Sequence, residues 1–199
     1  MRTRTESETG TASCEDPSVL DSECARLVDE CRQGNAEGFG RLVSLTEPRV
    51  RRMIGRLVLS RPDVDDLVQE TYLRAWKSLG RFRGDSRFST WLFRIAVNVT
   101  RSWRRARPAA LPLPGGDTLA ARAGAEPGDD ALIDAYERAL SGLSHDLRTT
   151  FLLHETEGLS YQEVAEAIGC PIGTVMSRLH RARQKVLAEL RERLEELTP

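Results

Sequence analysis

The sequence predicts an all-α protein made of two small helical domains joined by a flexible linker, the second containing a helix-turn-helix. Three observations lead to this prediction. Apolar residues recur at helical spacing over most of the 199 residues, aromatic residues make up only 6%, and a proline- and glycine-rich segment divides the pattern. With 40% hydrophobic and 30% charged residues, the chain can build a core. No stretch requires a β-strand.

The first 22 residues are expected to form a disordered acidic leader, because they are rich in Thr, Ser and Glu. A helical pattern begins near Asp21 and leads into the first domain, residues 23–107. Cys14, Cys24 and Cys31 lie in this region without forming a C-x-x-C pair. Free thiols are therefore expected, with a redox or metal-binding role as the alternative.

Several classes of protein are disfavoured by what the sequence lacks. Its apolar runs fall far short of the roughly 20 residues of a membrane span, and its N-terminus has no apolar signal core. We therefore expect a cytoplasmic protein without membrane insertion. Neither a zinc-type Cys/His spacing nor a nucleophilic or phosphate-loop arrangement is visible. No metal, cofactor or enzymatic activity is expected.

The first domain begins with amphipathic segments. Residues 36–59 interleave apolar side chains with arginines, and Pro48 is expected near a helix end or kink. Ser60 and Pro62 precede three aspartates, which predicts a helix start. That helix should run to Gly80 with these apolar residues at helical spacing: Val64, Leu67, Val68, Ala75, Trp76 and Leu79. Residues 81–89 are polar, contain Gly84 and should form a loop.

The helix predicted after this loop has two distinct faces. One is apolar in steps of four and should face the core: Trp91, Ile95, Val99 and Trp103. The other is polar: Arg94, Asn98, Arg101 and Arg105. Five arginines and no acidic residue lie between Trp91 and Arg107, which favours phosphate binding over a merely solvated face.

Charge is unevenly distributed along the chain. The whole sequence has a net charge of −1, but residues 32–107 carry 17 basic and 7 acidic side chains, a net charge of +10. Such a block is typical of a protein with a polyanionic partner; a solubilising surface is the alternative. The predicted linker, residues 108–132, is acidic, and residues 108–130 hold four of the nine prolines.

The second domain, residues 133–199, contains the pattern of a helix-turn-helix. Ser160 and Glu163 form a capping box that starts a helix, and Gly169-Cys170-Pro171 ends it. A second helix should start around Ile172 or Gly173 and run toward Leu197. In this motif the N-terminal part of the second helix contacts DNA bases in the major groove. The candidate contacts are Thr174, Ser177, Arg178, Arg181 and Arg183. An ordinary helical hairpin with a basic face is the alternative.

Two motifs resemble the extracytoplasmic-function (ECF) sigma factors of the sigma-70 family. The segment from Gly158 to Ala165, followed by Gly173 to Arg183, resembles the domain that recognises the promoter −35 element. Residues 65–76, DDLVQETYLRAW, and residues 82–98 resemble the helix that binds core RNA polymerase and the segment that melts the promoter. The resemblance covers roughly residues 30–107 and 133–192.

The resemblance implies a sigma factor that binds core RNA polymerase, directs it to −10 and −35 elements and helps melt DNA. The partners it implies are core RNA polymerase, promoter DNA and an anti-sigma factor. On the polymerase, the expected contacts are the clamp of the largest subunit and the flap of the second. The polymerase-binding candidates are Asp65, Asp66, Gln69, Glu70 and Arg74. The candidates for −10 recognition and melting are Phe82, Arg83, Asp85, Ser86, Arg87, Phe88, Arg94, Asn98, Arg101 and Arg105.

The sequence departs from the family in several places. Met176 and Val97 replace frequent basic residues, and Ser144-His145 replaces the usual proline-containing start of the last domain. The first two changes remove positive charge from predicted DNA-binding faces and leave the promoter sequence open. Two other classes remain: a stand-alone helix-turn-helix regulator, and a sigma-mimicking adaptor that binds an anti-sigma factor. The retained arginines argue against the adaptor.

Overall fold

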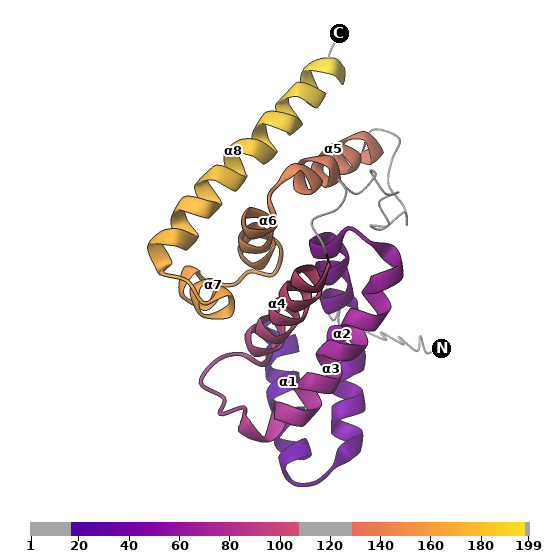
Figure 1. Ribbon diagram of the computed structural model, residues 1–199. Helices are drawn as coiled ribbons and strands as arrows, with labels where there is room; N and C mark the ends of the chain where they lie inside the picture. The colour runs from indigo at the N-terminus through magenta and orange to yellow at the C-terminus, as the bar shows by residue number, and fades with distance from the viewer. Residues whose placement is uncertain (1–16, 108–128, 198–199) are drawn as a thin grey trace, which may run out of the picture.

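A computed structural model describes residues 17–107 and 129–197, and every regular element in these two ranges is helical (Figure 1). Four long helices form a first unit and the remaining helices form a second. The predicted leader up to residue 16 and most of the predicted linker, residues 108–128, lie outside the described residues. None of the described helices combines the length and the apolar character that crossing a membrane requires.

The first unit consists of α1 (Pro17–Arg32), α2 (Ala36–Val58), α3 (Arg61–Ser78), the short 3-10 helix η1 (Leu79–Arg81) and α4 (Phe88–Ala106). The predicted leader ends too late, because residues 17–22 already belong to α1. Leu20 packs against the core that Cys24 and Leu27 enter, and this burial extends the helix beyond the expected start near Asp21.

Helix α2 passes through Pro48 instead of ending there. Asn35 caps its start by accepting a hydrogen bond from the Glu37 amide, and Leu59, with a φ of 54°, ends it in the left-handed region. Pro48 removes one backbone donor from the helix. Val50, Met53 and Ile54 are all buried just beyond it, and their packing holds the helix together.

Helix α4 buries a wider face than its sequence pattern predicts. Val99 is buried as expected, but Trp91, Ile95 and Trp103 are only partly buried at the edge of the core. The centre of the buried face is instead formed by Leu92, Phe93, Ala96, Val97 and Thr100. The buried face differs from the predicted one because α4 packs on α2 and α3 of its own unit and also on α7 of the second unit.

The second unit consists of α5 (Asp129–Gly142), α6 (His145–Phe151), a π-helical turn η2 (Leu152–Thr156), α7 (Tyr161–Ile168) and α8 (Ile172–Leu197). Helix α5 begins at Asp129, so residues 129–132 are helical and not part of the linker. The predicted capping box at Ser160 and Glu163 is present, and Gly169, with a φ of 75°, ends α7. The predicted helix-turn-helix is confirmed.

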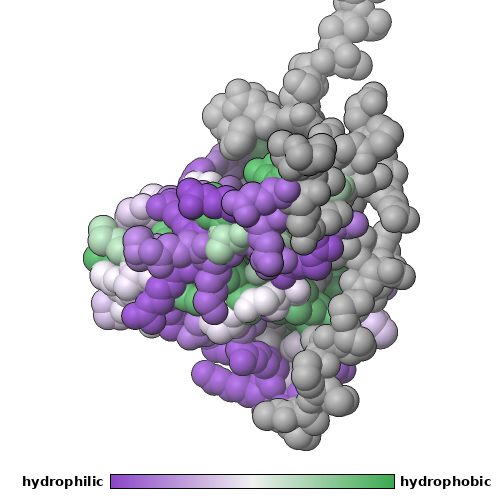
Figure 2. All heavy atoms as spheres, turned by 90° about the horizontal axis from the view of Figure 1, so that it is seen from above, coloured by the Kyte–Doolittle hydropathy of each residue, from purple (hydrophilic) through white to green (hydrophobic). Residues whose placement is uncertain are grey.

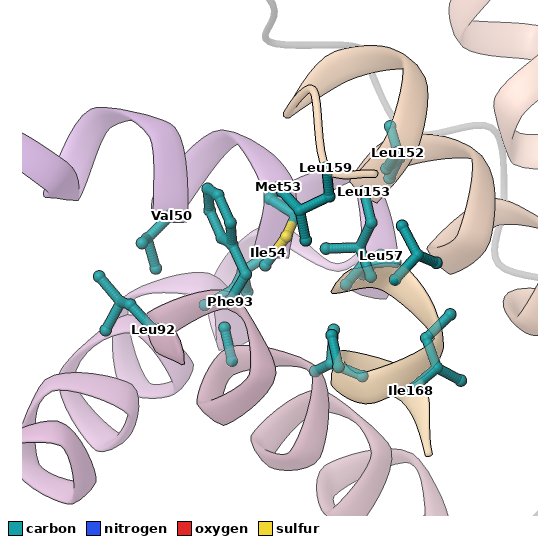
Figure 3. Packing of buried hydrophobic residues seen from close by; sticks show 14 of the residues in the cluster. Val50, Met53, Ile54, Leu57, Leu92, Phe93, Leu152, Leu153, Leu159 and Ile168 are labelled. Carbon is teal, nitrogen blue, oxygen red and sulfur yellow. The ribbon is translucent and has the colours of Figure 1, made fainter. Parts of the chain in front are cut away.

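The two units share one hydrophobic core. Figure 3 shows Met53, Ile54 and Leu57 of α2 beside Leu152, Leu153 and Leu159 of the second unit. Phe93 of α4 and Ile168 of α7 belong to the same cluster of buried residues. The sequence patterns predict two domains and a linker, but they carry no information about this contact. In the structure, the helix-turn-helix unit lies directly against α2 and α4.

Candidate nucleic-acid interface

The predicted −35 residues all lie on the N-terminal half of α8, away from its buried side. Val175, Leu179, Ala182 and Val186 face the core, and Ser177, Arg181 and Arg183 are exposed. Thr174 and Arg178 are half-buried. Helical spacing places Thr174, Ser177, Arg178 and Arg181 on one accessible side of α8 and Arg183 on the opposite flank of its buried side. Hydroxyl and guanidinium groups of this kind contact base edges and phosphates.

Two of these arginines already have acidic partners within the second unit. Arg178 donates to Asp146 at 2.6 Å, and the Arg183 Nε donates to Glu155 at 2.7 Å. Both pairs lie at the surface, where an ion pair contributes little and is easily exchanged for another partner. Among the described residues, Arg181 has no acidic contact and is the arginine of this face most available to a phosphate or base.

The predicted −10 residues are divided between the surface and the core. Arg83 and Asp85 are exposed, and Ser86 is half-exposed. Phe82 and Phe88 are only 8% and 3% exposed, with ring centroids 5.9 Å apart. Trp91 packs against both rings, at 5.1 Å and 5.6 Å between centroids. In this arrangement neither phenylalanine is accessible for stacking on a base.

The polar face of α4 is accessible over most of its length. Arg94, Asn98 and Arg105 are exposed. Arg101 is half-buried, because its guanidinium donates to the Ile168 carbonyl at the end of α7, at 3.0 Å. Arg87, at the start of α4, donates to Glu163 of α7 and to Asp21 of α1. Two predicted DNA-binding arginines are therefore engaged by other parts of the protein.

The predicted polymerase-binding face of α3 combines charges with exposed apolar groups. Asp65, Asp66 and Gln69 are exposed, and Glu70 accepts a hydrogen bond from Arg74 at 2.6 Å. Leu73 and Trp76 follow on the same helix, and each is 48% exposed. Trp76, one of the apolar residues at helical spacing, packs at the surface against Phe39, with ring centroids 4.8 Å apart. Sequence analysis did not single out Leu73.

The charges at the junction of the two units are segregated by unit. The first unit supplies arginines and the second supplies glutamates in each of three ion pairs. Arg49 contacts Glu157 at 3.0 Å, Arg56 contacts Glu137 at 2.7 Å, and Arg87 contacts Glu163 at 3.0 Å. The Glu157 side chain is only 3% exposed. Burial raises the pKa of this carboxyl group, and Arg49 opposes the shift.

Glu163 is both the capping residue of α7 and the main polar contact with α4. It accepts hydrogen bonds from the Arg87 guanidinium, the Thr90 hydroxyl at 2.9 Å and the Ser160 amide at 2.8 Å. Partial burial alone would raise the pKa of this group, but these hydrogen bonds lower it to about 2. Glu163 is therefore a carboxylate at neutral pH and holds the helix-turn-helix against α4.

Arg148 of α6 is buried, and none of the carboxylates in the described ranges pairs with it. Its guanidinium donates to the carbonyls of Leu140, Ser141 and Leu143 at 2.7–2.8 Å. It also donates to the Arg56 carbonyl near the end of α2, at 3.3 Å. Burial and the nearby Arg104 lower its pKa to about 10, so it stays charged. The carbonyl ends of two helices, which carry partial negative charge, stabilise this cation.

Comparison with known proteins agrees with this architecture. Residues 42–108 match the family model for Sigma-70 region 2, and residues 133–186 match that for Sigma-70, region 4. The chain is 39% identical over 175 residues to an ECF RNA polymerase sigma-E factor of Haemophilus influenzae, covering 80% of this chain and 91% of the relative. It is 37% identical over 186 residues to the RNA polymerase sigma-H factor of Pseudomonas aeruginosa, covering 86% and 95%.

Two solved structures have the same fold. One is the sigma factor RpoE of Bartonella quintana in complex with the anti-sigma factor NepR, with a TM-score of 0.68 and 28% identity over 78% of this chain and 98% of that one. The other is CnrH in complex with the cytosolic domain of CnrY, with a TM-score of 0.61 and 28% identity over 86% and 97%. The fold and the site define an all-helical protein with a basic helix-turn-helix in its second unit and, in its first unit, a helix whose exposed face mixes charged and apolar side chains. The chain belongs to the ECF sigma factors of the sigma-70 family.

Proposed function

We propose that this protein binds core RNA polymerase in the cytoplasm and directs it to promoters, where α8 contacts the −35 element and α4 with its preceding loop contacts the −10 element. The observation that carries the proposal is the pairing of two basic helix faces in one chain. The first is α4 and its end, where five arginines lie between Trp91 and Arg107. The second is α8, which carries Arg178, Arg181 and Arg183. A stand-alone helix-turn-helix regulator would need only the second face.

The described arrangement is a closed form that must open for this function. Arg87 and Arg101 are held by α7. Release of α7 from α4 frees both arginines for DNA. One solved relative, RpoE, is bound to the anti-sigma factor NepR, and the other, CnrH, is bound to the cytosolic domain of CnrY. We infer that this chain also has an anti-sigma partner, which would act by preventing the open form from engaging polymerase.

Run-off transcription with bacterial core polymerase tests the proposal directly. The template is a fragmented library of the source genome, assayed with and without the protein. New transcripts whose upstream regions share −10 and −35 elements would establish promoter-directed initiation. Polymerase binding without transcripts would point to a requirement for an activator. DNA binding without polymerase binding would favour the stand-alone regulator instead.

The Arg178→Ala variant should weaken recognition of the −35 element by about 1–3 kcal/mol, the contribution of one bidentate arginine–base contact. Arg178 lies on the accessible face of α8, and its Asp146 partner is a surface group that DNA can replace. Fluorescence anisotropy of the holoenzyme on labelled promoter would measure the loss. Arg191→Ala, the same change farther along α8, is the control. Equal discrimination between wild-type and altered −35 sequences would remove Arg178 from the interface.

The double variant Asp66→Ala, Glu70→Ala should lose polymerase affinity by about 2 kcal/mol or more, since both carboxylates face outward on α3. Its helical content should not change, because neither side chain contributes to the core. A pull-down with core polymerase and a circular dichroism spectrum measure the two properties. The matched control is Asp29→Ala, Glu37→Ala, which removes the same charge from α1 and α2. Normal polymerase binding by the α3 variant would refute the assignment of this face.

A further inference from the structure

A solvent-open hollow of about 490 Å³ lies where the two units meet, and arginine dominates its wall. Helix α4 contributes three of the arginines and α8 contributes the fourth. The start of α6 closes the hollow with a histidine and an aspartate. The residues that carry the argument are Arg101, Arg104, Arg105, Arg178, His145 and Asp146.

The hollow has a large excess of positive charge. Among the described residues, four guanidinium groups and one carboxylate line it, and that carboxylate, Asp146, pairs with Arg178 at 2.6 Å. Arg104 and Arg105 are exposed, and no acidic side chain among the described residues contacts either of them. With His145 neutral, the lining has a net charge of +3, from four arginines and one aspartate. Seen from above, the described residues form a mostly hydrophilic surface, with smaller apolar areas between polar side chains (Figure 2).

His145 provides a second indication of this positive field. Burial, together with the nearby Arg104 and Arg148, lowers the pKa of its imidazole to about 4. Its position as the first residue of α6 has the same effect, because the amino end of a helix disfavours a cation. The imidazole is therefore neutral at pH 7, adds no charge, and can hydrogen-bond to an anion.

We propose that this hollow binds a compact oligophosphate anion, held by arginines from both units. Guanidinium groups match phosphate oxygens in a bidentate geometry, and several of them favour an anion with several charges. The volume lies within the range of about 300–1,000 Å³ for small-ligand sites. Because α4 and α8 supply the wall together, the bound anion stabilises the closed arrangement. Arg101, Arg105 and Arg178 are also proposed DNA contacts, so the bound anion and promoter DNA would compete for the same side chains.

Calorimetric titration of the full-length protein with sodium tripolyphosphate at pH 7.5 and low salt tests the proposal. One site per chain is expected. Arg104→Ala, in the first unit, and Arg178→Ala, in the second, should each weaken binding about tenfold, which corresponds to one charge-assisted contact. Arg191→Ala removes the same charge outside the hollow and should leave the affinity nearly unchanged. Tripolyphosphate should also raise the melting temperature of the wild type more than that of Arg104→Ala.

The same titration with ATP shows whether the phosphate chain belongs to a nucleotide or to a free oligophosphate. Similar binding of tripolyphosphate and ATP without magnesium would support a chain presented by a nucleotide. Binding of tripolyphosphate alone would support a free oligophosphate. The proposal is overturned if no saturable binding occurs, or if Arg191→Ala weakens binding as much as Arg104→Ala. It is also overturned if Arg178→Ala has no effect, because the site would then not span both units.

Discussion

Replacing Arg148 with methionine should lower the free energy of unfolding by about 3–5 kcal/mol, because it removes a charged donor from several buried carbonyls. Methionine is similar in length but donates no hydrogen bond. The Ser141 and Leu143 carbonyls would lose this donor in the protein interior, whereas the Leu140 carbonyl keeps the Leu143 amide. Each buried carbonyl left without a partner costs about 1–3 kcal/mol. The contact of α6 with the end of α2 would be lost as well.

Urea unfolding followed by circular dichroism measures this effect. Arg148→Lys is the matched control, because it keeps the charge but lacks the planar fork that contacts several carbonyls at once. We expect the lysine variant to lie between the wild type and Arg148→Met. A loss below about 1 kcal/mol for Arg148→Met would show that water replaces the guanidinium, and that the carbonyls do not depend on it.

The Arg49→Glu variant should separate the two units without unfolding them. The new carboxylate would face Glu157, whose side chain is 3% exposed, in place of the present ion pair. Breaking a buried pair costs about 3–5 kcal/mol, and a like charge adds repulsion. The two units can avoid this cost by moving apart while the chain between them keeps them connected. The stacking of Arg49 over the Phe93 ring, at 5.5 Å, would also be lost.

Small-angle X-ray scattering should show a larger radius of gyration for Arg49→Glu, with unchanged helical content by circular dichroism. Promoter DNA should bind more tightly to the holoenzyme assembled with this variant, because Arg87 and Arg101 become available. The variant Arg49→Glu, Glu157→Arg restores an ion pair with reversed polarity and should return the protein toward the compact form. An unchanged radius for Arg49→Glu would show that the shared core alone holds the units together.

Local signals made the helix-turn-helix predictable from the sequence. The capping box at Ser160 and Glu163, the glycine after α7 and the apolar spacing along α8 act within a few residues of one another. The family resemblance depends on the same local motifs. The boundaries at residues 17 and 129 were predicted less well, because packing against distant helices extends α1 and α5 beyond their local signals.

The junction and its polar contacts could not be predicted in this way. Glu157 and Glu163 acquire their arginine partners from residues 76 or more positions away. Arg148 is an arginine on an otherwise ordinary amphipathic segment, and only the packed ends of α5 and α2 give it a role. The burial of Phe82 and Phe88 against Trp91 and the exposure of Trp76 likewise depend on tertiary packing. The proposed DNA contacts of Phe82 and Phe88 remain predictions.

The core shared by the two units has a consequence for the affinity of every partner that needs the open form. A partner of this kind binds with an apparent dissociation constant equal to the intrinsic one divided by the open fraction. If the junction favours closure by about 2.8 kcal/mol, about one molecule in a hundred is open, and the apparent affinity falls about a hundredfold. Single charge changes at Arg49 or Arg56 would then adjust how readily this sigma factor competes for polymerase, without altering any proposed DNA contact or the polymerase face of α3.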